Sequence, residues 1–159
     1  MICTDFCTRS QRGFSMIELM AVVTIIGILA VIAIPNYSAY IQRSRITEAT
    51  SRLADFRVKM EQYYQDNRHY GNANCADVNA PGWAAFTATK YFSYACAVSG
   101  VTANGGRQQY TVTATGLTGR ATGHIFTIAN FPTDPTQRTT QFKGSAVNKN
   151  CWLVKGTEC

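Results

Sequence analysis

The sequence predicts an α+β protein in which one long N-terminal helix packs on an antiparallel β-sheet of about four strands. Three observations lead to this fold class. Residues 14–34 form an apolar run, residues 46–63 place apolar side chains at helical spacing, and the later half of the chain contains short alternating segments separated by turn signals. One helix packed on consecutive strands with short connections is an α+β arrangement.

Length and composition set the frame for this prediction. The chain has 159 residues, enough for one domain with a modest core. Hydrophobic residues make up 46% and charged residues 15%, which argues against a disordered tail. The chain carries a net charge of +6, six cysteines and two histidines, and none of the cysteines forms a Cys-x-x-Cys pair.

The apolar run from Phe14 to Ile34 predicts a membrane helix. Every residue of the run is hydrophobic except Ser15, Glu18, Thr24 and Gly27. As a helix the run would be about 31 Å long, which matches a bilayer core of about 30 Å. Its apolar residues lie all round the helix rather than along one stripe, so a core helix of a soluble domain is the weaker interpretation.

A polar leader, residues 1–13, precedes the run. A secretory signal has the inverse order, and cleavage after its apolar region would discard the helix. The string Arg-Gly-Phe-Ser-Met-Ile-Glu at 12–18, the apolar run and Ile-Pro-Asn-Tyr at 34–37 together resemble the class III signal of type IV pilins. The resemblance implies the type IV pilin fold, cleavage between Gly13 and Phe14 by prepilin peptidase, and N-methylation of Phe14.

Glu18 would then be the fifth residue of the mature chain. An ionised carboxylate in hydrocarbon costs about 2.5–3.5 kcal/mol, so Glu18 needs either the interface or a partner. One explanation is that it reaches the interface near the helix end. The other, which the pilin resemblance implies, is an ion pair with the Phe14 amino group of a neighbouring subunit. Such a pair would favour one axial register, because a misplaced subunit leaves both charges unpaired.

Gly27 and Pro35 weaken the predicted helix locally. Membrane helices tolerate both residues, and in the pilin family this segment can loosen during assembly. From Asn36 onward the pattern becomes amphipathic, and we expect the helix to reach about Tyr64. Its charged faces include pairs such as Glu48 with Arg52.

After the helix, residues 71–90 indicate a long loop in which Trp83 and Phe86 are apolar anchors. Strands are expected at 91–98, 108–115 and 124–130. Either 141–143 or 151–155 would supply a fourth strand.

Four cysteines lie outside the leader, and an even count in an exported domain suggests two disulfides with three possible pairings. We favour Cys75–Cys96, which would tie the loop to the first strand, and Cys151–Cys159, which would close a C-terminal loop similar to the pilin D-region. No cysteine and histidine spacing resembles a zinc site, so metal binding is the weak alternative. No motif of a hydrolase, metalloprotease, nucleotide-binding enzyme or redox enzyme is present, so the sequence predicts no enzyme, cofactor or metal.

The basic excess lies in residues 100–159. The side chains that carry it are Arg107, Arg120, Arg138, Lys143, Lys149 and Lys155. Ordinary surface charge accounts for this pattern. The functional alternative is salt-sensitive binding of DNA phosphates, as in pilus-borne DNA receptors of the ComP type.

The C-terminal half, with Ile-Phe-Thr-Ile at 125–128 and Cys-Trp at 151–152, resembles PilE-type minor pilins. The resemblance implies a prepilin leader at 1–13, a transmembrane and filament-core helix at 14–35, and a periplasmic or extracellular domain at 36–159. It implies a structural subunit of a type IV pilus that serves twitching motility, adhesion or DNA uptake. A ComP-like DNA receptor for natural transformation and a major pilin are the alternatives.

The partners and location follow from the same resemblance. We expect other pilin subunits, prepilin peptidase and the inner-membrane assembly machinery as partners, with DNA added for the receptor alternative. The chain would cross the inner membrane of a Gram-negative bacterium once before assembly and lie in the extracellular pilus afterwards.

Overall fold

The structure, a computed structural model, describes residues 13–76, 86–101, 106–130 and 137–159. They form one long helix and a five-stranded antiparallel sheet, which confirms the α+β prediction. The chain divides into two compact units between Ala39 and Tyr40, and each unit is described by itself. Most of the expected leader and the expected anchor Trp83 lie outside the described residues.

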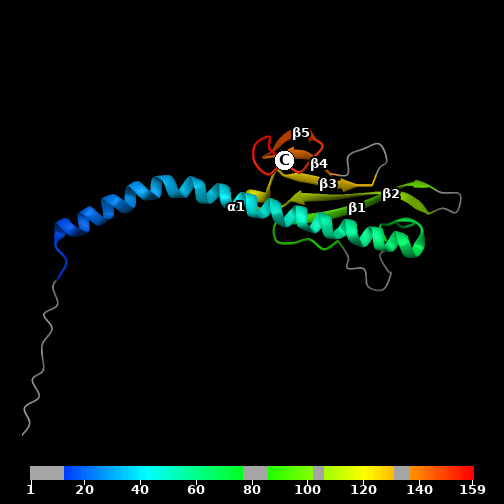
Figure 1. The fold of residues 1–159 in the computed structure, drawn as a ribbon, viewed down its shortest axis with the longest axis horizontal. Coiled ribbons are helices and arrows are strands. Elements are labelled where there is room, and N and C mark those ends of the chain that lie inside the picture. Colours follow the sequence, from blue (N-terminus) through cyan, green and yellow to red (C-terminus); the bar gives the residue numbers. More distant parts are fainter. Residues whose placement is uncertain (1–12, 77–85, 102–105, 131–136) are drawn as a thin grey trace, which may run out of the picture. The chain divides into compact units, whose positions relative to one another are not determined.

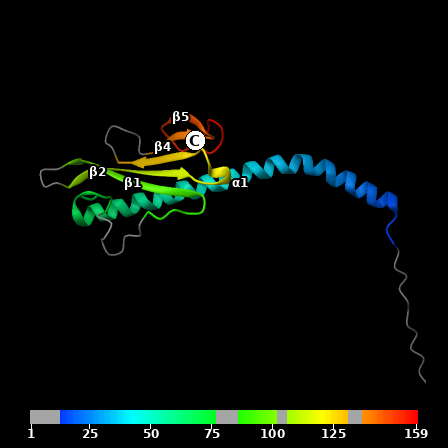
Figure 2. The same ribbon diagram turned by 180° about the vertical axis from the view of Figure 1, so that it is seen from behind.

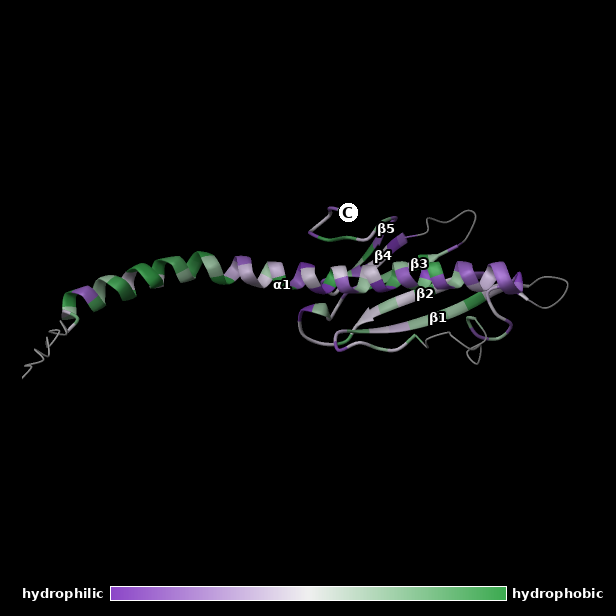
Figure 3. Ribbon diagram, turned by 60° about the horizontal axis from the view of Figure 1, so that its bottom comes forward, coloured by the Kyte–Doolittle hydropathy of each residue, from purple (hydrophilic) through white to green (hydrophobic). Residues whose placement is uncertain are grey.

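Helix α1 runs from Met16 to Asn67 and contains Pro35. None of the described residues up to Ala39 is buried, and the helix up to Ile34 is mostly hydrophobic, as the green part of the ribbon in Figure 3 shows. Beyond Tyr40 the helix is amphipathic. The buried residues there are those of the expected face, namely Ile46, Ala49, Leu53, Phe56, Met60 and Tyr63. The 3.6-residue period therefore predicted the packing face correctly.

The sheet is a meander in the order β1-β2-β3-β4-β5 (Figures 1 and 2). The strands are β1 (Phe92–Val101), β2 (Arg107–Gly116), β3 (Ile125–Ala129), β4 (Gln137–Phe142) and β5 (Ser145–Lys149). The expected number of about four strands was thus one too low. The fourth strand is β4, which includes part of 141–143, whereas 151–155 contributes only the isolated bridge of Lys155 with Glu158.

Two physical reasons explain why the last strands were misjudged. Between Thr139 and Gln141 the β4–β5 register shifts, which breaks the alternation of inward and outward side chains along β4. Strand β5 lies at the edge of the sheet and is mostly exposed, so its sequence contains no apolar alternation. Periodicity can locate only strands that bury one face regularly.

The core of the C-terminal unit lies between α1 and one face of the sheet. Alternate residues of the strands point inward and are buried, among them Phe92, Tyr110, Val112, Phe126 and Ile128. Phe56 of the helix meets Tyr94 of β1 with ring centroids 5.3 Å apart. Phe86 lies 4.5 Å from Phe56, so this expected loop anchor packs on the core.

The C-terminal segment completes the core without forming a sixth strand. Thr139 of β4 is fully buried, and its hydroxyl donates to the Cys151 carbonyl at 2.7 Å and accepts from the Leu153 amide at 2.9 Å. The Trp152 indole donates to the Thr127 carbonyl at 2.9 Å. These bonds satisfy backbone groups that would be paired with a neighbouring strand in a regular sheet. Leu153 is buried in this arrangement.

Candidate assembly residues and basic surfaces

The expected processing residues precede the helix directly. Gly13 and Phe14 are exposed, and α1 begins two residues later at Met16. The Leu19 amide donates to the Ser15 carbonyl at 3.1 Å, which forms the first turn around Glu18. A carboxylate in the first turn is favourable with the positive end of the helix dipole.

The N-terminal part of α1 is long and apolar enough to cross a membrane. Its mean hydropathy in an 18-residue window reaches 2.8, and none of that window is buried within the protein. Large apolar side chains are exposed along the whole stretch, for example Ile28 at 67% and Val31 at 74%. Such a surface needs a bilayer or other apolar helices around it.

Within the part of the chain that the structure describes, Glu18 has neither a hydrogen-bond nor an ion-pair partner. The Thr24 hydroxyl, in contrast, is satisfied by the carbonyls of Met20 and Ala21 at 3.0 and 2.8 Å.

The two residues expected to weaken the helix both lie inside α1. A side chain at Gly27 would meet nothing within 4 Å, so packing within the chain does not require glycine there. Pro35 has no amide to donate to the preceding turn. Next to it the Asn36 side chain donates to the Ile32 carbonyl at 3.1 Å and the Ser38 hydroxyl to the Pro35 carbonyl at 2.9 Å. These side-chain bonds lie next to Pro35 and add to the backbone hydrogen bonds of this part of the helix.

Two disulfides join the pairs that the sequence favours. Cys75 is bonded to Cys96 of β1, with 6.0 Å between the Cα atoms. Cys151 is bonded to Cys159, with 5.7 Å between the Cα atoms and only 8 residues of sequence separation. The first bond ties the segment after α1 to the edge strand, and the second closes the C-terminal loop. Among the described residues no group of three or more His, Cys, Asp or Glu side chains could hold a metal ion.

The six basic residues proposed for DNA do not form one patch. Arg107 and Arg138 lie on β2 and β4, at positions that face away from α1. Lys149 is at the exposed edge strand, and Lys155 is in the C-terminal loop. Arg120 is in a short 3-10 helix between β2 and β3, and Lys143 is in the β4–β5 turn.

The strands that form the outer face of the sheet contain no acidic side chains. Threonines alternate outward along β2. Thr113 pairs with Thr127 of β3, and Thr127 in turn pairs with Arg138 of β4. The Nε of Arg107 also donates to the Asn72 carbonyl at 3.2 Å. This bond holds the Arg107 side chain near the start of β2.

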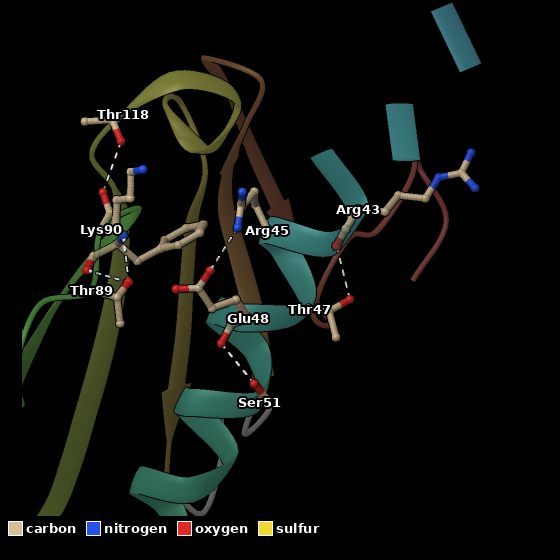
Figure 4. A network of polar contacts seen from close by, with 9 residues as sticks. Arg43, Arg45, Thr47, Glu48, Ser51, Thr89, Lys90 and Thr118 are labelled. Atoms are coloured by element: carbon tan, nitrogen blue, oxygen red, sulfur yellow. Dashed lines mark hydrogen bonds and ion pairs between the residues drawn. The ribbon is translucent and has the colours of Figure 1, made fainter. Parts of the chain in front are cut away.

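A second basic region was missed by the sequence analysis. Arg45 of α1 lies over the Tyr91 ring at 3.6 Å and 3.8 Å from Glu48 (Figure 4). Lys90 also approaches the Tyr91 ring, at 5.5 Å. No spacing in the sequence could reveal this contact, because Arg45 and Tyr91 are brought together only by the packing of the helix on the sheet.

Comparisons with known proteins agree with these features. Residues 8–34 match the prokaryotic N-terminal methylation motif. Residues 35–124 match the family described as type IV minor pilin ComP, DNA uptake sequence receptor. The second match covers more than half of the chain.

Among curated proteins, the chain is 42% identical over 81 residues to the fimbrial protein EcpC of Eikenella corrodens, which is 51% of this chain and 50% of that protein. It is 48% identical over 61 residues to the type IV major fimbrial protein FimA of Dichelobacter nodosus, 38% of this chain and 39% of that protein. A fimbrial protein of Pseudomonas aeruginosa is 49% identical over 53 residues, 33% of this chain and 34% of that protein.

In each case the chain spans half or less of the relative's length. The methylation motif, the apolar helix and the greater part of the α+β unit are nevertheless covered by the two family matches together. The chain belongs to the type IV pilins, in the family described as type IV minor pilin ComP, DNA uptake sequence receptor.

Proposed function

We propose that this chain is a minor subunit of a type IV pilus. The observation that carries the proposal is the match of residues 35–124 to a minor pilin family directly after an N-terminal methylation motif. In this proposal prepilin peptidase removes residues 1–13 and Phe14 becomes the methylated N-terminus. Residues 14–35 anchor the subunit in the inner membrane and then enter the filament core, and residues 36–159 form the outer domain.

Glu18 has the central role in assembly. Its carboxylate has no partner in the described part of its own chain and lies one helical turn after Phe14. The amino group created by cleavage at Phe14 of one subunit would neutralise Glu18 of the next. A buried charge left without its partner is strongly unfavourable, so the pair selects the correct axial position. Partners in this step are other pilin subunits and the inner-membrane assembly machinery, and no catalytic step is assigned to the chain.

The test is the Glu18→Ala variant in the bacterium that makes the pilus. We expect normal membrane insertion and processing, but no subunit in sheared pili, measured by quantitative mass spectrometry of both fractions. Asp55→Ala, which removes an exposed acid of the same helix outside the apolar run, is the matched control. Incorporation of the Glu18→Ala subunit at the wild-type level would contradict the proposal. The same measurement in wild-type cells separates a minor from a major subunit.

A second proposed function is binding of DNA during natural transformation. The observation that favours it is the description of the matched family as a DNA uptake sequence receptor. The outer face of the sheet is suited to a phosphate backbone, because arginines and hydroxyl or amide side chains are common phosphate ligands. We infer that Arg107 and Arg138 contact phosphates across this face, and Lys149 and Lys155 extend the positive field at its edge.

A gel-shift titration tests this function. The protein is the fragment 39–159, which contains every buried side chain of the described structure. Binding should weaken steeply as the salt concentration is raised from about 50 to about 200 mM. Thr111→Glu with Thr113→Glu places two negative charges on the outer face and should abolish binding. The control Arg57→Gln with Lys59→Gln removes two cations from the helix and should change the affinity little.

Two results would reject DNA binding by the outer face. One is the absence of any shift at the lowest salt concentration. The other is equal affinity of the Thr111→Glu/Thr113→Glu fragment and the wild-type fragment. Neither result bears on filament incorporation, which the Glu18 experiment measures separately.

A further inference from the structure

Four cations lie at the end of the sheet where β1 begins and β4 ends, and we call this set the basic end. Its members are Arg45, Lys90, Arg120 and Lys143. They come from α1, from the residue pair before β1, from the 3-10 helix and from the β4–β5 turn. Segments far apart in the sequence are therefore brought to one place by the fold.

Hydrogen bonds between loops hold these segments together. The Gly144 amide donates to the Gly123 carbonyl at 2.8 Å, which joins the turn with Lys143 to the segment after Arg120. Gly123 has a φ of +79°, and an added Cβ would lie 2.5 Å from the Gly144 nitrogen, so this approach requires glycine. The Thr118 hydroxyl donates to the Lys90 carbonyl at 3.1 Å, which joins the third segment (Figure 4).

The helix is attached to the same end. The Gln42 side chain lies 3.2 Å from the His124 ring, and His124 directly follows the Gly123 turn. Arg45 is held between Tyr91 and Glu48. Glu48 offsets one of the four positive charges, which leaves a positive excess among these side chains.

The chain connection limits how far this positive surface can lie from the apolar run. Arg45 follows Ile34, the last residue of the apolar run, by eleven positions. Even a fully extended chain covers at most about 3.5 Å per residue, so the two residues are within about 39 Å of each other. Between them Tyr37 and Tyr40 are each 67% exposed, and tyrosine is enriched at the boundary between lipid and water.

We propose that the basic end binds the headgroups of anionic phospholipids while the subunit is anchored in the membrane. Positive side chains beside a membrane span are attracted to anionic lipids. The anchor keeps the basic end at a high effective concentration next to the lipid surface, so weak contacts suffice. This proposal rests on membrane anchoring by the N-terminal segment and is independent of filament incorporation and of DNA binding by the outer face.

Lipid rather than DNA is the favoured occupant for one reason. The outer sheet face offers DNA strands without acidic residues, whereas the basic end includes Arg45, which follows the apolar run by eleven positions. Contact with anionic headgroups would hold the domain against the membrane before assembly, and its release would accompany extraction of the subunit into a filament.

Lysine footprinting of the full chain in vesicles tests the proposal. The protein is reconstituted at low salt in vesicles of phosphatidylcholine alone or of phosphatidylcholine and phosphatidylglycerol mixed two to one, and lysine acetylation rates are measured by mass spectrometry. We expect Lys90 and Lys143 to react at least threefold more slowly in the anionic vesicles. Lys59 and Lys149, which lie outside the basic end, serve as internal controls and should not change. In about 0.5 M salt the protection should disappear, because charge interactions are then screened within a few ångströms.

Variants that lack positive charges of the basic end provide a second test in the same footprinting experiment. Arg120→Gln with Lys143→Gln should bring the Lys90 acetylation rate in the anionic vesicles close to its rate in phosphatidylcholine alone, since each basic residue contributes roughly fivefold to lipid affinity and the pair roughly 25-fold. Arg57→Gln with Lys149→Gln removes the same number of charges elsewhere and should leave the protection of Lys90 unchanged. Circular dichroism verifies that both variants are folded.

Three results would overturn the proposal. Equal acetylation rates of Lys90 in the two vesicle types would exclude the contact. Equal protection of all four lysines would indicate general adsorption instead. Protection of Lys90 and Lys143 by a DNA duplex but not by anionic vesicles would assign the basic end to DNA. In each case a normal level of membrane-inserted protein shows that the anchor itself has not failed.

Discussion

His124 shows how a single buried side chain couples the helix to the sheet. It is only 1% exposed, lies between the rings of Phe126 and Phe142, and contacts Gln42 of α1 at 3.2 Å. With the Gln42 amide nitrogen as donor, the ring Nε2 is the acceptor, which requires the neutral form of the ring. Its Nδ1 is buried without a hydrogen-bond partner in the described structure. Burial lowers the pKa of His124, and the nearby charge of Lys143 lowers it further.

These features predict an acid-dependent loss of stability. Because the pKa of His124 is lowered in the folded state, the unfolded chain binds a proton first as the pH falls below about 6.5. The free energy of unfolding should be highest above pH 7 and should decrease from pH 6.5 to 5 by up to about 1.4 kcal/mol per pH unit. Urea unfolding of the fragment 39–159 at several pH values measures this effect.

The matched variants separate the two histidines of the chain. His124→Phe should flatten the profile between pH 5 and 6.5, even if its stability at pH 7 also changes. His69→Gln, at the end of the helical segment, should keep the slope. A flat wild-type profile, or loss of the slope in His69→Gln alone, would contradict the assignment to His124.

At the scale of elements, strand β4 acts as the attachment site for the chain's C-terminal segment. The Thr139 hydroxyl bonds two backbone groups of that segment, the Cys151 carbonyl and the Leu153 amide, in a fully buried place. The Cys151–Cys159 disulfide then closes the loop that follows. An irregular segment can lie in a core only when its backbone groups are satisfied in this way.

Removing the Thr139 hydroxyl should therefore destabilise the fold, although valine keeps the shape of the side chain. Thr139→Val leaves a buried amide and a buried carbonyl without partners, and it should lower the free energy of unfolding by about 1–3 kcal/mol in urea at pH 7. Thr113→Val, on the outer face of the adjoining part of the sheet, is the control and should stay within about 0.5 kcal/mol of the wild type. Equal stability of the two variants would show that the Thr139 bonds do not hold the C-terminal segment.

At the scale of the whole molecule, the two units contribute in different ways. The buried side chains of the described structure all lie beyond Ala39, and both disulfides join residues of the C-terminal unit. The N-terminal unit exposes its apolar surface, which requires a membrane or other subunits. Folding of the domain and insertion of the helix should thus be separable.

This separation predicts that residues 40–159 fold without the apolar segment. With both disulfides formed, the fragment should unfold in one cooperative thermal transition within about 3 °C of the full chain in a mild detergent, measured by circular dichroism. Peptide mapping should find Cys75 joined to Cys96 and Cys151 joined to Cys159. A fragment that lacks a cooperative transition despite these disulfides would show that the N-terminal segment is needed for the fold.

Periodicity and local motifs were enough to predict much of this protein. The buried face of α1 repeats every three or four residues from Ile46 to Tyr63, and a helix must place such residues on one side. The membrane span and the processing motif are continuous strings, so recognising them required no tertiary information. The first three strands bury alternate side chains, as in β2 with Tyr110, Val112 and Ala114, and were located to within a few residues.

Only the tertiary structure decided the rest. Strand β5 is an exposed edge strand, and its identity depends on pairing with β4 rather than on its own pattern. The basic residues of the C-terminal half, a single group in the sequence, are divided between the outer face and the basic end, where Arg45 and Lys90 join them. Sheet pairing and helix packing bring these residues together in space. Their distance along the chain does not indicate that they are in contact.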